Sequence, residues 1–257
     1  MTKANIYNKI RSSRLYHMAN ILGIKLSGLS YEQLLFDIEL GLEKKTKRYL
    51  VTPNPEIILA TLKDENLKNI INAADFSLAD GFGLKLAGIL KGEKIIRITG
   101  SDLSLKILSL AEKNNYKVAI IIWEKGLSSV EKVNAALKRK YVNLDFAVYK
   151  SPRESSLSKE LIKKINDYSP AILFVALGFP EQEKVVAGNL TDFKDVNLAL
   201  GVGGTFDFIT GKKRRAPRLF RYLGLEWLWR LIIQPKRIKR IWRATVVFMY
   251  KVLSTKR

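Results

Sequence analysis

The sequence contains no cysteine and a single histidine, His17. Without cysteine the chain has no disulfide bonds and no thiolate metal ligands, so thiol chemistry is excluded. A Ser-His-Asp mechanism would depend on His17, which lies in a basic N-terminal arm, whereas a triad needs a base that is held rigidly by a third group. The sequence also lacks Asp-x-Asp pairs and histidine clusters, the usual anchors of a divalent ion on a nucleotide diphosphate. We therefore expect neither a metal nor another cofactor.

Long apolar runs are also missing. No stretch reaches the roughly eighteen apolar residues that a transmembrane helix needs, and the basic start of the chain is not followed by the apolar core of a secretory signal. We expect a protein that stays inside the cell. With 257 residues and 47% hydrophobic residues, the chain can bury a full core without metal or disulfide.

Acidic residues are scarce at both ends of the chain. Residues 212–257 contain fifteen Lys or Arg residues and one acidic residue, Glu226, and the first 25 residues contain five basic residues and no acidic one. The formal net charge of +21 therefore lies mostly outside the nearly neutral middle of the chain. Such basic ends indicate a polyanionic partner: anionic lipid, nucleic acid or a diphosphate.

Short apolar segments alternate with helical patterns along the middle of the chain. We expect strands at residues 19–26, 48–51, 76–79, 94–98, 117–123, 144–149, 171–177 and 196–200. This alternation predicts an α/β fold: a Rossmann-like, mostly parallel sheet with helices on both faces. We place this body at residues 19–211 and a basic arm at residues 1–18.

The character of the sequence changes at residue 212. A basic loop is followed by apolar residues at helical spacing up to Ile232, and residues 236–253 form a second predicted helix that begins with basic residues. Three of the four tryptophans lie here: Trp227, Trp229 and Trp242. Tryptophan beside lysine and arginine on an amphipathic helix is typical of a segment lying in a membrane interface. We interpret residues 212–257 as a membrane-associating helical appendage; a solvated or nucleic-acid-facing helix is the alternative.

Polar and glycine-rich segments follow the predicted strands. Because the carboxyl ends of parallel strands meet at one edge, we expect these segments to form the site. They include Thr52, Asn54, Asp80, Gly81, Arg97, Asp102, Gln182, Gly203 and Gly204. The simpler alternatives are that Thr52 or Asn54 only caps a helix, that Asp80-Gly81 is a plain turn, and that the glycines only form tight turns, since none matches a phosphate-binding fingerprint.

Seven ordered motifs resemble the WecG/TagA/CpsF glycosyltransferase family. They are Thr52-Pro53-Asn54-Pro55-Glu56, Ala79-Asp80-Gly81, Arg97 with Gly100 and Asp102, Leu177-Gly178-Phe179-Pro180 with Gln182-Glu183, Gly201-Val202-Gly203-Gly204-Thr205-Phe206-Asp207, Arg215-Ala216-Pro217, and Gly224-Leu225-Glu226-Trp227-Leu228-Trp229-Arg230. The likeness runs from about Ile21 to Arg240. The common Glu-Pro pair after the last motif is Gln234-Pro235 here.

The resemblance implies an inverting, metal-independent transferase of cell-envelope polysaccharide or teichoic-acid-type assembly. Such an enzyme moves N-acetylmannosamine or a related hexose or uronic acid from a UDP donor to an undecaprenyl-diphosphate-linked acceptor. The resemblance further implies a peripheral protein at the cytoplasmic face of the plasma membrane, a homo-oligomer, and no nucleic-acid partner.

The resemblance also assigns roles to residues. It implies that Asp80 is the catalytic base, that Thr52 is a further catalytic residue lining the pocket, and that Arg230, Arg237 and Arg240 grip diphosphate. It implies that the substrates are bound by Asn54, Gly81, Arg97, Asp102, Gln182, Gly203 and Gly204. A single carboxylate suffices for inversion, because one base removes the acceptor proton while UDP leaves from the opposite face. The alternatives are a non-catalytic membrane or nucleic-acid adaptor, a UDP-sugar hydrolase, and appendage arginines that are merely solvated.

Overall fold

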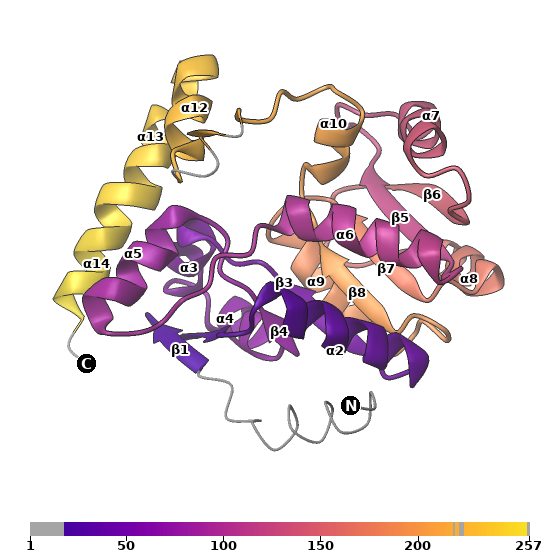
Figure 1. Ribbon diagram of the computed structural model, residues 1–257, viewed down its shortest axis with the longest axis horizontal. Helices are drawn as coiled ribbons and strands as arrows, with labels where there is room; N and C mark the ends of the chain where they lie inside the picture. Colours follow the sequence, from indigo (N-terminus) through magenta and orange to yellow (C-terminus); the bar gives the residue numbers. More distant parts are fainter. Residues whose placement is uncertain (1–17, 218, 221–223, 256–257) are drawn as a thin grey trace.

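The computed structural model describes residues 18–217, 219–220 and 224–255 (Figure 1). Residues 1–17 of the predicted basic arm, His17 among them, lie outside the described residues. The side chain of Arg230 does too.

A six-stranded parallel sheet forms the centre of the molecule. Its strand order is β4-β3-β8-β7-β5-β6. The strands are β3 (Arg48–Val51), β4 (Phe76–Ser77), β5 (Val118–Trp123), β6 (Phe146–Ser151), β7 (Ile172–Ala176) and β8 (Leu198–Gly201). Strands β3, β4, β5, β7 and β8 are short and mostly buried, as expected of a parallel sheet covered on both faces, whereas most residues of the edge strand β6 are partly exposed.

Helices cover both faces of this sheet, so the predicted α/β fold is confirmed. One face packs on α2 (Tyr31–Glu43), α6 (Gly100–Lys113), α7 (Val130–Lys140) and α10 (Thr205–Ile209). The other packs on α3 (Pro55–Thr61), α4 (Glu65–Asn72), α5 (Phe82–Lys91), α8 (Lys159–Tyr168) and α9 (Glu181–Asn189). Within one strand the faces alternate: Leu173 and Val175 join the second core, and Phe174 joins the first.

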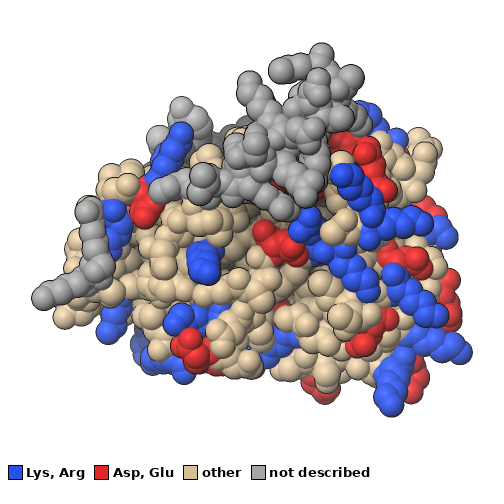
Figure 2. Space-filling view, turned by 90° about the horizontal axis from the view of Figure 1, so that it is seen from below, with Lys and Arg blue, Asp and Glu red and all other residues tan. Residues whose placement is uncertain are grey.

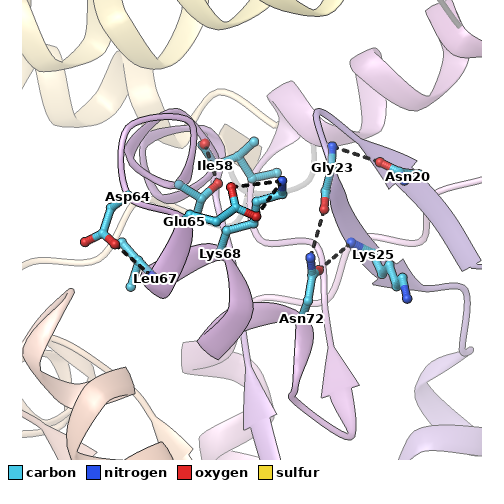
Figure 3. Close-up of polar contacts among 10 residues, drawn as sticks. Asn20, Gly23, Lys25, Ile58, Asp64, Glu65, Leu67, Lys68 and Asn72 are labelled. Carbon is cyan, nitrogen blue, oxygen red and sulfur yellow. Dashed lines mark hydrogen bonds and ion pairs between the residues drawn. The ribbon is translucent and has the colours of Figure 1, made fainter.

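The first predicted strand is wrong, because residues 19–26 form a hairpin. Strand β1 (Met18–Ile21) pairs antiparallel with β2 (Ile24–Ser27) in a separate two-stranded sheet. Leu22 and Gly23 both have positive φ, 54° and 86°, which is the backbone of a tight two-residue turn. Asn72 at the end of α4 holds the hairpin by accepting from the Lys25 amide at 3.0 Å and donating to the Gly23 carbonyl at 2.9 Å (Figure 3).

The strand predicted at residues 94–98 is also wrong. Only one bridge forms there, between Ala79 and Arg97. Its neighbour β4 is two residues long, so there is little ladder to extend. The apolar residues of this segment serve packing instead: Ile95 lies so close to Gly88 of α5 that a Cβ on that glycine would meet it at 2.8 Å.

The C-terminal helices pack onto the body of the molecule. They are α12 (Glu226–Ile233), a 3₁₀ turn (Pro235–Arg237), α13 (Ile238–Trp242), a π-helical turn (Arg243–Val247) and α14 (Phe248–Ser254), so the predicted helix over 236–253 consists of consecutive segments. Phe248 and Val252 of α14 are fully buried, in one core with α3 and α5. Figure 1 shows α14 running along α5, with which it is in contact.

None of the helices in the described part of the chain is both long and apolar enough to cross a bilayer. On the face shown in Figure 2, basic and acidic side chains are interspersed rather than separated, as expected for the nearly neutral middle of the sequence.

Phe248→Ala should lower the free energy of unfolding by about 3–5 kcal/mol, because truncating a buried phenylalanine leaves a cavity in the core. Tyr250→Ala is the matched control, since this residue of the same helix is 67% exposed. Urea unfolding of both variants measures the effect. Equal stabilities would show that α14 does not belong to the core of the body.

Candidate active site

Three loops lie side by side at the carboxyl edge of the sheet because backbone hydrogen bonds join them. The Leu78 amide donates to the Val51 carbonyl and the Asp80 amide to the Pro53 carbonyl, both at 2.9 Å, and the Ile98 amide donates to the Ala79 carbonyl at 3.0 Å. Asp80 is thereby placed between the loop after β3 and the segment that leads to α6. Its carboxylate is half-buried and next to Gly81, whose φ of 105° suits only glycine.

Two cavities meet at Asp80. The first, of about 200 Å³, is lined by basic side chains of the loop after α10, Lys213, Arg214 and Arg215, and by Thr99 and Ser101. The second, of about 350 Å³, has apolar walls that include Phe82, Leu86 and Met249. The two cavities share four lining residues: Asp80, Glu226, Arg237 and Arg240. Two carboxylates, Asp80 and Glu226, therefore line both a cationic cavity and a largely apolar one, and that of Glu226 is paired with Arg97.

A third cavity adjoins the basic one. It has a volume of about 230 Å³ and shares Gly204 and Lys213 with the basic cavity. Its wall includes Trp123 at the end of β5, whose ring lies 5.9 Å from the Arg153 guanidinium carbon. Asp207 orients this wall, since it accepts from Ser128 at 2.9 Å and pairs with Lys213 at 2.6 Å.

Three ion pairs join the C-terminal part of the chain to the body. Arg240 contacts Glu56 at the start of α3, Arg97 lies 3.4 Å from Glu226 of α12, and Arg215 lies 2.8 Å from Asp102. The Arg240–Glu56 pair is largely exposed, and exposed pairs contribute little, about 0–1 kcal/mol. An anionic ligand can therefore replace the carboxylate of Glu56 on Arg240 at small cost.

The structure brings seven of the predicted site residues to the walls of the basic and the apolar-walled cavity. Asp80, Asn54, Gly81, Arg97, Arg237 and Arg240 line the apolar-walled cavity, and Gly204 lines the basic one. Asn54 is also the N-cap of α3, accepting from the Glu56 and Ile57 amides at 2.9 and 3.1 Å. Asn54 therefore caps α3, as the simpler alternative predicted, and it also lines the apolar-walled cavity.

Other predicted residues have different surroundings. Thr52 is not among the residues lining these cavities; its hydroxyl packs against Gly100, where a Cβ would meet it at 2.8 Å. Asp102 accepts from the Thr99 hydroxyl at 2.7 Å and pairs with Arg215. Gly203 lines the third cavity. The side chain of Arg230 is outside the described residues.

Gln182 is buried and connects two loops rather than lining a cavity. Its side-chain oxygen accepts from the Gly178 amide at 3.1 Å and the Gly203 amide at 2.9 Å, and its nitrogen donates to Glu183 at 2.8 Å. Gly201 leaves room for this arrangement, since a Cβ there would lie 2.6 Å from the Gln182 nitrogen. Gln182 therefore fixes Gly178 and Gly203, which line the third cavity, without lining that cavity itself.

Several residues of the site were not predicted. Glu226 had a signal in the sequence, because it is the only acidic residue among fifteen basic ones in residues 212–257, and Glu56 lies inside a motif used for the resemblance. Trp123, Arg153 and Lys213 had no comparable signal, since a residue at a strand end or in a basic loop looks the same whether or not a cavity faces it. Among the described residues, no three His, Cys, Asp or Glu side chains gather in one group.

Comparison with known proteins gives a consistent assignment. The model of the "Glycosyl transferase WecG/TagA/CpsF family" matches residues 19–257. Curated relatives from Staphylococcus aureus strains NCTC 8325 and COL are each 31% identical over 93% of both chains, and both are named N-acetylglucosaminyldiphosphoundecaprenol N-acetyl-beta-D-mannosaminyltransferase.

Glu183→Gln should change how stability depends on pH. Burial raises the pKa of Glu183 from 4.5 to about 7, and its Oε2 and the nearby Tyr49 hydroxyl are buried without a hydrogen-bond partner among the described residues. Between these pH values the folded state keeps a proton that the unfolded state has lost, so stability falls as pH rises from 4.5 to 7 and stays lower above it.

Glutamine cannot ionise, so the free energy of unfolding of Glu183→Gln should not fall in this way. In the wild type the fall corresponds to about 3 kcal/mol between pH 4 and pH 8. Urea unfolding at the two pH values measures the difference. Glu160→Gln on the exposed surface of α8 is the control and should follow the wild type. A pH-independent difference between Glu183→Gln and wild type would mean that the carboxyl is ionised in the folded protein without penalty.

Proposed function

The chain belongs to the WecG/TagA/CpsF family of glycosyl transferases, and from this premise we propose which sugar, acceptor and mechanism it uses. It transfers N-acetylmannosamine or a related hexose or uronic acid from a UDP donor to an acceptor linked to undecaprenyl diphosphate. The names of the relatives support the acceptor and the sugar. The product belongs to cell-envelope polysaccharide or teichoic-acid-type assembly.

The position of Asp80 between two unlike cavities is the observation that carries this proposal. A transferase has to hold a charged donor and a lipid-linked acceptor on opposite sides of the reacting carbon. The basic cavity suits the donor diphosphate, and the apolar-walled cavity suits an acceptor that carries a lipid. Asp80, Arg237 and Arg240 face both.

In the proposed reaction Asp80 takes the proton of the acceptor hydroxyl. The hydroxyl oxygen forms a bond to the anomeric carbon of the donor sugar, and the bond from that carbon to the UDP oxygen breaks on the opposite side, which inverts the configuration. Thr52 is proposed to act with Asp80, since it directly precedes Pro53, whose carbonyl accepts from the Asp80 amide. Asp102 contributes by holding Arg215 at the donor side.

The leaving diphosphate needs positive charge. Lys213, Arg214 and Arg215 supply it on the donor side, and Arg230, Arg237 and Arg240 of the C-terminal helices are proposed to bind diphosphate too. This set of cations supports a reaction without a divalent metal. The nucleoside lies in the third cavity, which is continuous with the basic one through Gly204 and Lys213 and which Gln182 shapes.

The C-terminal helices also suit a membrane surface. Trp242, Val246, Tyr250 and Leu253 are 44–67% exposed and lie among Lys239, Arg243 and Lys251. Aromatic and aliphatic side chains beside basic ones favour the interface of an anionic bilayer over a nucleic acid, so we place the enzyme peripherally at the cytoplasmic face of the plasma membrane. A homo-oligomer stays a prediction from the family resemblance.

Asp80→Asn should reduce turnover by about 10²–10⁴-fold, because the amide cannot accept the acceptor proton. The measurement is UDP release from UDP-sugar with a lipid-diphosphate acceptor, with a chelator present throughout. Asp167→Asn on the exposed surface of α8 is the control and should keep the wild-type rate. If turnover falls by less than tenfold in Asp80→Asn, Asp80 is not the base. If the wild-type enzyme needs added metal, the reaction is not metal-independent.

UDP release that is equally fast without acceptor would favour the alternative, a UDP-sugar hydrolase. The second alternative, a non-catalytic adaptor, disagrees with membership of a glycosyltransferase family.

Arg237→Ala should lower kcat/KM by about 10- to 100-fold, the usual cost of one hydrogen bond to a charged group. Lys236→Ala is the matched control, since this cation is the neighbouring residue, is exposed and does not line the shared walls. A substitution is preferable to removing residues 212–257, because Phe248 and Val252 belong to the core. Equal kinetics of the two variants would argue against diphosphate binding by Arg237.

A further inference from the structure

Glu183, in the first turn of α9, is a buried carboxyl that lies behind the site. The residue is 2% exposed, and it lines none of the three cavities at the edge of the sheet. Its Oε1 accepts a hydrogen bond of 2.8 Å from the Nε2 of Gln182. Acidic side chains are rarely buried unless a partner holds them, and here that partner is Gln182. Any effect of Glu183 on the cavities therefore passes through Gln182.

The two ends of the Gln182 side chain have opposite partners. Its oxygen accepts from the amides of Gly178 and Gly203, and its nitrogen donates to Glu183. The oxygen and nitrogen of an amide have nearly the same shape, so hydrogen-bond partners rather than packing decide which end faces which group. The nitrogen lies in the buried space that Gly201 leaves, where the Glu183 oxygen satisfies its N–H. Glu183 thereby keeps the side chain in place, with its oxygen toward the two glycines.

These two glycines connect the Gln182 amide to the wall of the third cavity, which both of them line. Gly178 packs against Arg153, since a Cβ on the glycine would lie 3.3 Å from the guanidinium carbon. Arg153 in turn donates to the Phe179 carbonyl at 2.7 Å, and its guanidinium carbon lies 5.9 Å from the Trp123 ring. A displacement of Gly178 would therefore change the distance between the guanidinium and the ring that face the cavity.

A carboxyl is a costly choice for a position that only needs to be filled. Burial raises the pKa of Glu183 to about 7, so its ionised form lowers the stability of the folded state. An apolar side chain of similar size would avoid this cost. Ionisable groups that are kept in spite of such a cost are typical of functional sites.

We propose that Glu183 is a positioning residue for the nucleotide donor, because by holding Gln182 it fixes the two glycines that shape the third cavity. The inference rests on the proposed binding of the donor nucleoside in that cavity, and it adds a residue on which donor affinity depends. Glu183 contacts neither substrate. Its effect is confined to the donor, since the apolar-walled cavity on the acceptor side does not include Gly178 or Gly203.

The first measurement is hydrogen exchange at single backbone amides, followed by NMR on the full chain without any ligand. Glu183→Leu replaces the acceptor by an apolar side chain of similar size. Exchange at Gly178 and Gly203 should become at least about tenfold faster, the effect expected when a buried N–H loses its acceptor and its side chain moves away. The Val202 amide is the internal reference, because it donates to the Val175 carbonyl at 2.9 Å and should keep its rate.

The second measurement is the binding of UDP by isothermal titration calorimetry. Glu183→Leu should weaken UDP binding at least about tenfold. In turnover it should raise the KM for the UDP-sugar by a similar factor and leave the KM for the lipid-linked acceptor unchanged. Glu183→Gln restores an acceptor oxygen, so it should keep the wild-type exchange rates and the wild-type affinity for UDP.

Tyr49→Phe is the control at a matched buried position. Its hydroxyl is buried without a hydrogen-bond partner among the described residues, and its pKa is raised by burial and by the nearby Glu183. Removing this hydroxyl leaves the acceptor for Gln182 in place, so exchange and UDP affinity should stay those of the wild type. If Glu183→Leu does not fold, Glu183→Asp replaces it, because it withdraws the acceptor by one methylene and should show the same two losses.

Three results would overturn the proposal. One is unchanged exchange at Gly178 and Gly203 when the acceptor is removed. Another is a loss of UDP affinity in Glu183→Gln or Tyr49→Phe that equals the loss in Glu183→Leu. The third is an equal acceleration of exchange at Val202, because it would indicate a general loosening of the fold.

Turnover separates this inference from the proposed function. If UDP binding depends on Glu183 but the wild type transfers no sugar to a lipid-linked acceptor, the positioning role stands and the proposed reaction is wrong. If the wild type transfers sugar and Glu183→Leu has the same KM for the UDP-sugar, the reaction stands and the positioning role is wrong.

Discussion

The hydrogen bond from the Asp80 amide to the Pro53 carbonyl decides the geometry of the site. Strand β4 is only two residues long, so the sheet itself does not reach the position of Asp80. The backbone is held beyond the strand by bonds to the loop after β3 on one side and to the segment at Ile98 on the other. The backbone at Asp80 is thereby fixed, although the residue is half-buried and not part of regular structure.

The second constraint comes from the C-terminal helices. They supply Arg237 and Arg240 to both cavities at Asp80, and they do so from a fixed position because Phe248 and Val252 are buried in the core. The carboxylates of Glu56 and Glu226 lie against Arg240 and Arg97 in this arrangement. These pairs place guanidinium groups before any ligand arrives, and the largely exposed Arg240–Glu56 pair is weak enough for a diphosphate to replace its carboxylate.

Much of the fold followed from the sequence, and the misses have physical reasons. The alternation of apolar strands and helical patterns predicted the parallel sheet. The hairpin at residues 18–27 was missed because eight apolar-rich residues fit one strand as well as two, and only the positive φ angles of Leu22 and Gly23 distinguish them. The strand predicted at residues 94–98 did not form because a strand needs a neighbouring strand that is long enough to pair with, and β4 has only two residues.

The site was predictable to the level of loops but not of side chains. The carboxyl-edge rule placed Asp80, Asn54 and Arg97 near one another. It could not show that Gln182 turns inward to bind Gly178 and Gly203, because that depends on the space left by Gly201. Cavity walls such as Trp123 depend in the same way on packing between distant segments, which local patterns do not contain.

The burial of Phe248 and Val252 also constrains the order in which the molecule can be completed during synthesis. The face of the sheet covered by α3 and α5 closes only when a stretch almost two hundred residues later has left the ribosome. Until then Ile58 and Leu84 lack part of their covering, and contacts this distant along the chain form slowly. The nascent body therefore exposes apolar surface beside the future active site, and one late folding step both covers that surface and brings the arginines to Asp80.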